Sequence, residues 1–453
     1  MTHTEKLVDF VRRTDYEKLP PEVVRQAKSV ILDTLGCGLA TIAEDPPKAE
    51  IAFQFVGRFA KPEEATVLGR GMRASSLMAA FANGILCHGI DFDDTHKEAL
   101  THTSAVIVPA ALASAESSGL GGKELVTSTV LGYEVAVRVG MAVMPSHYKF
   151  WHSTATNGTF GAAMAAGKNF GLDKERLTDA LGLAGTQAAG LLTYLEFGDY
   201  TKSFNPGKSA FNGIFAALLA EAGASGPPTM LEHPRGYSYA YSAEPKLDNL
   251  TRGLGSTYEI MLNAFKPYPS LLASHPPIDA ILSLRKAHRL APEKIRKITS
   301  RTYNTVKSHF SNYNPETTMA ARLSVPYCMA VAAADGAAGL EQFTLEKIND
   351  PRVREMLGKI EIIADAELNK LYPEKFPAVV SIETTDGQVY QEAVYYPTGD
   401  PNNPLSVEAL KDKFRGLAGR FLAPAAVEGL IEMVDNLEQV DDVRALTRLT
   451  TKG

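Results

Sequence analysis

Cysteine is scarce in this chain of 453 residues, which contains only Cys37, Cys87 and Cys328. Each lies in an apolar stretch, so reduced, buried thiols are the expected state. Three cysteines could in principle hold an iron–sulfur cluster of the dehydratase type. The spacing that usually brings such ligands together is missing, so we do not expect a cluster.

Long hydrophobic runs are also lacking. We found no apolar run of membrane-spanning length, and the first residues, Met1 to Lys6, lack the pattern of a signal peptide. We therefore expect a soluble protein in the cytoplasm, without a membrane partner.

The chain has no excess of positive charge. It carries 46 Lys and Arg against 52 Asp and Glu, a net charge of −6, which argues against a general nucleic-acid binder. An anionic substrate must therefore be met by local cations. With 45% hydrophobic residues, the chain can bury a large core, and its length favours two domains.

Helical periodicity dominates from Glu22 to about Gly223, with clear helices predicted over 124–144 and 209–222. The Gly- and Ala-rich run at 158–167 predicts helices whose backbones approach closely. These glycines do not fit the dinucleotide fingerprint, and no strand pattern precedes them, so a phosphate loop is not expected.

The pattern changes after the Pro-rich turn that starts at Lys266. A helix is predicted over 276–288, followed by strands over 295–303 and 359–364 and a hairpin of 379–384 with 389–394 through Asp386-Gly387. Helical periodicity returns over 405–422 and 426–437. The prediction is a mainly α protein with an α+β part: a large helical domain of residues 1–266 with 396–453 packing back onto it, and a smaller inserted α+β domain of residues 267–395.

The segment from His88 to His102 is the strongest indication of function. Its fifteen positions hold four carboxylates and three of the ten histidines in the chain. A histidine fixed by a carboxylate can accept or release a proton near neutral pH. We expect Asp91, Asp93 or Asp94 to orient His96 or His102 in one wall of an active site.

Two other interpretations of this segment stay open. Asp93, Asp94 and Thr95 could begin a helix, because Asp and Thr side chains accept hydrogen bonds from the free N–H groups there. A metal site is the second, since His and Asp are common ligands. No His-x-x-x-His or Cys-x-x-Cys pair supports it, and no metal is expected.

Three further polar clusters are candidates for the same site. His152 follows the only tryptophan at a predicted helix start, which suits an anion, although Ser153 or Thr154 could be plain caps there. Thr201 to Lys208 looks like a polar turn before a helix at Ser209, with Lys202 and Lys208 as cations for a carboxylate, although surface lysines are common. The run Lys266 to His275 falls at the proposed domain boundary, where ligands often bind.

Taken together and in this order, these motifs resemble the MmgE/PrpD family. The matching runs are His88 to Thr95, Trp151-His152, Thr201-Lys202 with Gly207, and Lys266 to Pro269 with His275, and the resemblance extends from Ile31 to the region of Tyr327. The family includes 2-methylcitrate dehydratase, cis-aconitate decarboxylase and iminodisuccinate epimerase.

The resemblance implies a helical domain made from both chain ends, a smaller lid domain, a homodimer, and a cofactor-free active site in the cleft between domains. In the decarboxylase branch, the positions of this chain that resemble pocket residues are Asp91, Thr95, His102, His152, Lys202, Lys266 and Tyr327. Leu271 departs from the pattern, because vertebrate decarboxylases carry a pocket histidine there.

The family members share the task of moving a proton at a carbon next to a carboxylate. We expect Lys202 and Lys266 to bind substrate carboxylates, and His102, oriented by Asp91, to carry the proton. His152 or Tyr327 would protonate a leaving hydroxyl, while Thr95, Asp94 and His275 would contact the substrate.

The expected function is a cofactor-independent lyase that dehydrates or decarboxylates a small di- or tricarboxylate. An epimerase using the same acid–base groups is the alternative. A third hypothesis, a binding protein on an enzyme fold without activity, is disfavoured by the intact set of charged residues.

Overall fold

The computed structural model describes residues 1–452, which divide into two compact units. The first unit contains Met1–Tyr194, Tyr200–Asn263 and the C-terminal segment from Ser406. The second contains Leu195–Asp199 and Ala264–Leu405. The first unit is therefore made from both ends of the chain.

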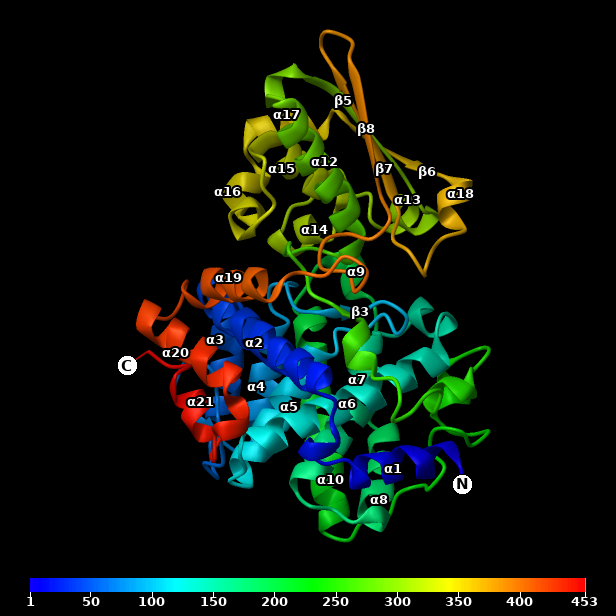
Figure 1. Ribbon diagram of the computed structural model, residues 1–453, viewed down its shortest axis with the longest axis vertical. Coiled ribbons are helices and arrows are strands. Elements are labelled where there is room, and N and C mark those ends of the chain that lie inside the picture. Colours follow the sequence, from blue (N-terminus) through cyan, green and yellow to red (C-terminus); the bar gives the residue numbers. More distant parts are fainter. Residues whose placement is uncertain (453) are drawn as a thin grey trace. The chain divides into compact units, whose positions relative to one another are not determined.

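The first unit is helical, with only short strands (Figure 1). Its helices are α1 (His3–Arg13), α2 (Pro21–Glu44), α3 (Pro46–Gly57), α4 (Ser76–Cys87), α5 (Ser104–Ser117), α6 (Gly122–Val143), α7 (Ser153–Asn169), α8 (Lys174–Gly185), α10 (Thr201–Glu221), α11 (Tyr237–Tyr241), α19 (Val407–Ala418), α20 (Pro424–Asp435) and α21 (Arg444–Arg448). Its strands are β1 (Ala65–Thr66), antiparallel to β2 (Arg73–Ala74), and β3 (Thr95–His96). Helix α9 (Tyr194–Phe197) and strand β4 (Asn263–Ala264) lie where the chain passes from one unit to the other.

Small residues set the close packing at the centre of this unit. Helix α7 contacts α5, α6 and α10, and α10 also contacts α4. A Cβ added at Gly161 of α7 would lie 2.4 Å from the carbonyl oxygen of Gly132 in α6, and one at Gly213 of α10 would lie 2.3 Å from Ala162 Cβ. Larger side chains at these glycines would force the helices apart, so the predicted close approach is present.

Helix α6 is long and apolar enough to cross a membrane, judged by length and composition alone. The sequence prediction that no run reaches this length did not include it. All of its most apolar window is buried inside the unit. It packs against α5 and α7, so it is a core helix here.

The C-terminal helices belong to the first unit. Helix α19 begins where Ser406 accepts a hydrogen bond from the N–H of Ala409, and it packs along α2. The ammonium of Lys413 lies 2.6 Å from a carboxylate oxygen of Asp33 in α2 and donates to the carbonyl of Phe92 at 2.8 Å. The C-terminal segment thereby contacts both α2 and the acidic segment, which is the stretch from His88 to His102 that contains Phe92.

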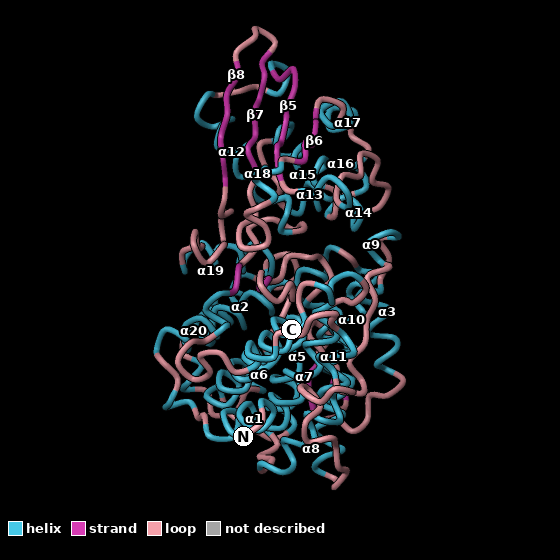
Figure 2. The backbone as a smooth tube through the Cα atoms, turned by 90° about the vertical axis from the view of Figure 1, so that its right-hand side faces the viewer, coloured by secondary structure: helices cyan, strands magenta, loops and turns pink. Residues whose placement is uncertain are grey.

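The second unit is built on a sheet of four strands, in the order β6-β5-β7-β8 (Figure 2). Strand β5 (Ile295–Thr302) pairs in parallel with β6 (Ile360–Ala364) and antiparallel with β7 (Ala378–Thr384), which forms a hairpin with β8 (Val389–Val394). Gly387 has a φ of 86°, the left-handed conformation that the hairpin turn requires. The predicted strands and hairpin are present, with bounds shifted by one residue at most.

Helices pack against this sheet within the second unit. The α-helices that lie wholly in this unit are α12 (His275–His288), α13 (Asn304–His309), α14 (Thr318–Arg322), α15 (Val325–Asp335), α16 (Leu345–Ile348), α17 (Pro351–Leu357) and α18 (Ala366–Asn369). Helix α12 packs against β7 and β8, and α15 contacts both α12 and β6. The predicted fold class, mainly α with an α+β part, is confirmed.

One local prediction is wrong. Residues 201–208 do not form a turn before a helix at Ser209, because α10 begins at Thr201 and has Pro206 inside it. A proline at this sixth position cannot donate the hydrogen bond to the carbonyl of Lys202, so the packing of α10 on α4 and α7 must favour the helix there. Lys202 is therefore the second residue of a long helix.

Candidate active site

The segment between α4 and α5 brings its polar side chains into the interior of the first unit. Helix α4 ends at Cys87, α5 begins at Ser104, and most residues between them are buried. Asp91 has a φ of 54°, a left-handed conformation that Asp tolerates better than most residues. Burial of so many ionisable groups requires partners, and these come from the segment itself, α6, α7 and α10.

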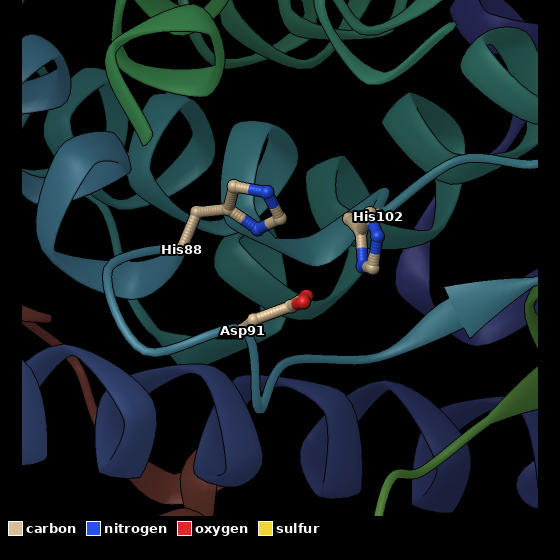
Figure 3. Close-up of side chains that lie close together, drawn as sticks. All are labelled: His88, Asp91 and His102. Atoms are coloured by element: carbon tan, nitrogen blue, oxygen red, sulfur yellow. The ribbon is translucent and has the colours of Figure 1, made fainter. Parts of the chain in front are cut away.

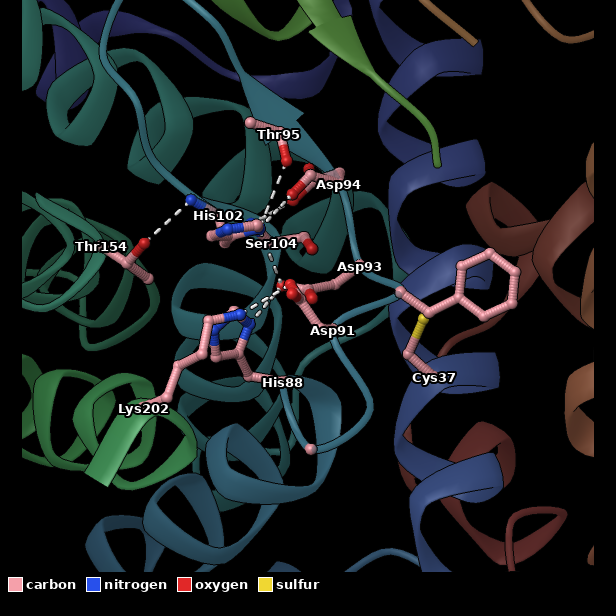
Figure 4. Close-up of polar contacts among 12 residues, drawn as sticks. Cys37, His88, Asp91, Asp93, Asp94, Thr95, His102, Ser104, Thr154 and Lys202 are labelled. Carbon is pink, nitrogen blue, oxygen red and sulfur yellow. Dashed lines mark hydrogen bonds and ion pairs between the residues drawn. The ribbon is translucent and has the colours of Figure 1, made fainter. Parts of the chain in front are cut away.

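Asp91 and Lys202 form a buried ion pair. The ammonium of Lys202 lies 2.7 Å from Oδ1 of Asp91, and both side chains are almost fully buried. A buried pair of this kind fixes the positions of both charges. It brings the second residue of α10 against the acidic segment (Figure 4).

His102 is held in one tautomer when neutral. Its Nδ1 lies 2.8 Å from the backbone carbonyl of Asp94, which can only accept, so Nδ1 carries the proton and Nε2 is the basic nitrogen. Its side chain is 17% exposed, whereas the facing Asp93 is 0% exposed. Nε2 is therefore the atom suited to exchange a proton with a substrate.

Asp93 lies between two imidazoles. Its Oδ2 accepts a hydrogen bond from Nδ1 of His88 at 2.8 Å and lies 3.6 Å from Nδ1 of His102. The two rings are near neighbours, with centroids 4.7 Å apart. The carboxylate closest to His102 Nδ1 in these contacts belongs to Asp93, while Asp91 pairs with Lys202.

Asp94 has a structural environment that favours its neutral form. Its Oδ1 accepts a hydrogen bond from the N–H of Ser104, at the start of α5, and its Oδ2 accepts one from the hydroxyl of Tyr133. Burial, together with the charge of Asp93, raises the pKa of Asp94 to about 8. No helix begins at Asp93 to Thr95, since Thr95 belongs to β3, so that interpretation of the segment is wrong. Asp94 instead accepts from the first N–H of α5.

His152 stands at the N-cap of α7 without a side-chain capping bond. Its Nδ1 lies 3.2 Å from the amide nitrogen of Asn205, which donates, so Nε2 carries the proton. Burial, with the nearby charges of His88 and Lys202, holds the pKa of His152 well below its usual range. His152 is therefore a neutral hydrogen-bond donor whose buried Nε2 has no protein partner among residues 1–452.

Two other candidate residues of the first unit contact His102, while Ser153 and His96 have partners outside this cluster. Thr95 Oγ1 lies 3.3 Å from His102 Nδ1, and Thr154 Oγ1 accepts the backbone N–H of His102 at 3.0 Å. The hydroxyl of Ser153 donates to the carbonyl of Leu100 and does not cap α7. His96 turns elsewhere, with its Nε2 3.6 Å from a carboxylate oxygen of Glu259.

One group has ligand-type atoms close enough for a metal ion. These atoms of His88, Asp91 and His102 lie within 4.8 Å of one another, and Figure 3 shows the Asp91 carboxylate directed toward the space beside the two rings. The ammonium of Lys202 already sets a positive charge against Asp91. The group is therefore better suited to acid–base chemistry, with the lysine as the cation.

Three predicted site residues belong to the second unit. Lys266 is buried, and Nε2 of His275, at the start of α12, lies 3.2 Å from the carbonyl of Ser270. Tyr327 is buried in α15, where its hydroxyl donates to the carbonyl of Gln342 at 2.6 Å. Burial raises the pKa of Tyr327 well above its usual range. Their part in the substrate site stays a prediction.

Four members of the cluster are missing from the site residues that the sequence predicted: His88, Asp93, Tyr133 and Asn205. Asp93 was one of three carboxylates that could orient a histidine, and His88 and Asn205 lay in the quoted motifs without a role of their own. The spacing His88-x-x-x-x-Asp93 is no known signal, because a loop of irregular backbone joins them. Tyr133 and Asn205 come from helices α6 and α10 and carry no local pattern at all.

Two models of known protein families match the sequence of this chain. The MmgE/PrpD N-terminal domain matches residues 5–250, and the MmgE/PrpD C-terminal domain matches residues 268–439. The chain belongs to the MmgE/PrpD family. The predicted family is confirmed.

Relatives within the MmgE/PrpD family match over nearly the whole length. The human cis-aconitate decarboxylase is 31% identical, over 98% of this chain and 94% of the relative. The cis-aconitate decarboxylase of Aspergillus terreus is 27% identical, over 98% and 95%. The 2-methylcitrate dehydratase of Cupriavidus necator is 24% identical, over 92% and 90%. These names denote lyases, so the prediction of a lyase-type enzyme is supported.

Proposed function

We propose that the protein is a cofactor-independent lyase that moves a proton at a carbon next to a carboxylate of a small di- or tricarboxylic acid. The observation that carries the proposal is the ion pair of Lys202 with Asp91 beside the imidazole of His102. It combines a fixed positive charge with a proton carrier inside a largely buried cluster.

Lys202 supplies the charge for substrate binding. An ammonium has three N–H donors, so it can contact Asp91 and a substrate carboxylate together. The neutral Nε2–H of His152 offers a second donor to the same anion. In our proposal Lys266 of the second unit binds another carboxylate.

His102 carries the proton in both candidate reactions. In a dehydration, its Nε2 removes the proton next to the carboxylate, and the electron pair of that C–H bond forms a C=C bond. The C–O bond breaks as a second acid gives a proton to the hydroxyl, which leaves as water. In a decarboxylation, CO2 leaves, the electron pair of the broken C–C bond stays on carbon, and the imidazolium of His102 protonates that carbon. The greater identity to relatives named cis-aconitate decarboxylase makes decarboxylation the first reaction to test.

The test is a turnover screen of the purified protein with cis-aconitate, 2-methylcitrate, citrate and iminodisuccinate. Products are identified by NMR, and CO2 release is measured directly. We expect one of these acids to be consumed, with rate unchanged after chelator treatment and dialysis. Absence of turnover of all related acids, or activity restored only by an added metal, would contradict the proposal.

Two variants link the reaction to the site. His102→Gln and Lys202→Met are expected to lower kcat/KM by about 10²–10⁴-fold, the usual range for an acid–base group. Lys174→Met is the matched control, because Lys174 is exposed and pairs with Asp9 elsewhere in the unit. Equal activity of all three variants would remove the site from the mechanism.

The same assay in D2O separates the alternative epimerase. An epimerase exchanges the proton next to the carboxylate with solvent but releases neither CO2 nor water from its substrate. We expect loss of CO2 or water instead. Exchange without either loss would replace the lyase by the epimerase.

A further inference from the structure

One carboxylate oxygen serves two imidazoles in this site. Oδ2 of Asp93 is 2.8 Å from Nδ1 of His88 and 3.6 Å from Nδ1 of His102, and Asp93 and His88 are both fully buried. The same Nδ1 of His102 reaches the carbonyl of Asp94 at 2.8 Å (Figure 4). Asp93 therefore has a different relation to each ring.

The relation to His88 is a hydrogen bond. A carboxylate accepts only, so the bond requires a proton on Nδ1 of His88. The relation to His102 is one of charge, because its Nδ1 proton is directed to the carbonyl of Asp94, and 3.6 Å is long for a hydrogen bond. A negative charge at that distance stabilises the imidazolium form.

We propose that Asp93 is the positioning residue of this site: its carboxylate holds the ring of His88 by a hydrogen bond and faces the ring of His102 as a fixed counter-charge. Asp93 acts through the two imidazoles and touches no substrate. Its role rests on the proposed proton transfer by His102, but its effect on the rings can be measured without turnover.

Several other ionisable groups surround this carboxylate and act on the same rings. Cys37 of α2, Cys87 of α4 and Asp94 of the same segment interact electrostatically with Asp93. The groups further out are Asp33, paired with Lys413 of α19, Asp91, paired with Lys202 of α10, and His152, which lies near His88. Thiol burial raises the pKa of Cys87 well above its usual range, so it stays neutral. The variants below change only Asp93 or its hydrogen-bond donor, which keeps these groups constant.

The first experiment follows the histidine rings by NMR in protein labelled with ¹⁵N-histidine. In Asp93→Asn we expect His102 to keep its Nδ1–H tautomer, because the carbonyl of Asp94 remains. Its pKa should fall by about one unit or more, because a counter-charge is lost. His88 should lose its single tautomer. Asp173→Asn, an exposed helix cap of α8, is the matched control and should change neither ring.

The second experiment removes the donor instead of the carboxylate. His88→Met leaves Asp93 with one imidazole fewer, so the pKa of His102 should rise, the opposite of the first variant. His88→Asn can keep a donor near the same place and should stay close to the unmodified protein. This pair keeps the proposal testable even where Asp93→Asn fails to fold.

Activity gives an independent measurement. Once a substrate is known, kcat/KM is measured as a function of pH. In Asp93→Asn the part of this profile that reports the ionisation of His102 should move to lower pH by the same amount as the ring pKa, while KM changes little. Unchanged ring pKa values in Asp93→Asn, or a fall in His88→Met, would overturn the role of Asp93. If the NMR changes occur as expected but the unmodified protein turns over none of the acids, the proposed function is overturned and the role of Asp93 is not.

Discussion

Among single residues, Lys202 and Asp91 depend on each other most directly, because each compensates the buried charge of the other. Lys202→Met removes the cation that is paired with a buried carboxylate, so we expect the free energy of unfolding to fall by about 3–5 kcal/mol. The double variant Asp91→Asn, Lys202→Met should recover most of this loss. Urea denaturation of the four proteins of this cycle measures the coupling, and a coupling near zero would mean that the two charges do not depend on each other.

His147 gives the fold a pH dependence of predictable sign. Burial, opposed by its hydrogen bond to the carbonyl of Tyr241, lowers the pKa of His147 to about 4. The unfolded chain takes up this proton near pH 6.5, and the folded chain does so only near 4, so stability falls as the pH drops through this window. The loss is about 3 kcal/mol for this group.

The variant His147→Gln tests the assignment. It should be less stable than the unmodified protein at pH 7.5, because the imidazole Nε2 lies 2.8 Å from Thr156 Oγ1 and that hydrogen bond is lost. Its unfolding free energy should depend less on pH between 6.5 and 4. The difference between the two proteins cancels the contributions of Asp94 and His152, and parallel curves would refute the prediction.

The sequence singled out residues that meet in the fold where a residue type is rare and carries its own chemistry, while their role in catalysis stays a proposal. Asp91, His102, His152 and Lys202 were named from histidine density, helix starts and the family resemblance, and the structure brings these four together. It left open which of Asp91, Asp93 and Asp94 would face a histidine, and it did not predict the ion pair of Asp91 with Lys202. Which of two nearby carboxylates meets a ring depends on the left-handed backbone at Asp91, which neighbouring residue types do not specify.

Among the elements, α10 is held against α4 by direct backbone contact. A Cβ on Gly207 would lie 2.4 Å from the carbonyl oxygen of Phe81, and one on Gly84 would lie 2.7 Å from Cα of Gly207. Gly207→Ala should therefore lower the unfolding free energy by about 1–3 kcal/mol. It should also lower kcat/KM, because α10 carries Lys202 and α4 leads into His88.

The control for this prediction is a glycine with open space. A Cβ on Gly416 of α19 meets nothing within 4 Å, so Gly416→Ala should stabilise the protein by about 0.4–1 kcal/mol. Thermal unfolding of both variants gives the comparison. A Gly207→Ala protein as stable and active as the unmodified one would show that the helices can separate without cost.

Element boundaries were predicted well where period and turn residues agree. The hairpin of β7 with β8 was marked by alternation and by Asp386-Gly387. The start of α10 was missed, because Asn205, Pro206 and Gly207 are typical of turns. The packing of α10 on α4 and α7 favours the helix there despite these residues, and such tertiary contacts have no local signature.

For the whole molecule, Lys413 joins the C-terminal segment to the interior of the first unit. Its ammonium pairs with Asp33 and also lies 4.4 Å from the centre of the Phe92 ring. Lys413→Met leaves Asp33 buried beside α19, so we expect a loss of about 3–5 kcal/mol of unfolding free energy. Restoration by a second change, Asp33→Asn, measured by urea denaturation, is the check, and an additive double variant would contradict it.

The sequence indicated that both chain ends share one helical unit, because helical periodicity returns after Pro404. The predicted domains were residues 1–266 with 396–453, and residues 267–395. In the structure the boundaries fall after Asn263 and before Ser406, and Leu195–Asp199 belongs to the second unit. No sequence pattern indicates that these five residues belong to the second unit. The expected homodimer and cytoplasmic location stay predictions, and light scattering on the purified protein tests the first.

The central claim is that His102 moves a proton next to a carboxylate that Lys202 binds, without a metal or coenzyme. The most direct measurement is the turnover of cis-aconitate and its related acids by chelator-treated protein, with His102→Gln and Lys202→Met assayed beside it. The account predicts release of CO2 or water by the unmodified protein and a loss of about 10²–10⁴-fold in both variants. Undiminished turnover by either variant, or turnover that requires an added metal ion, would contradict it.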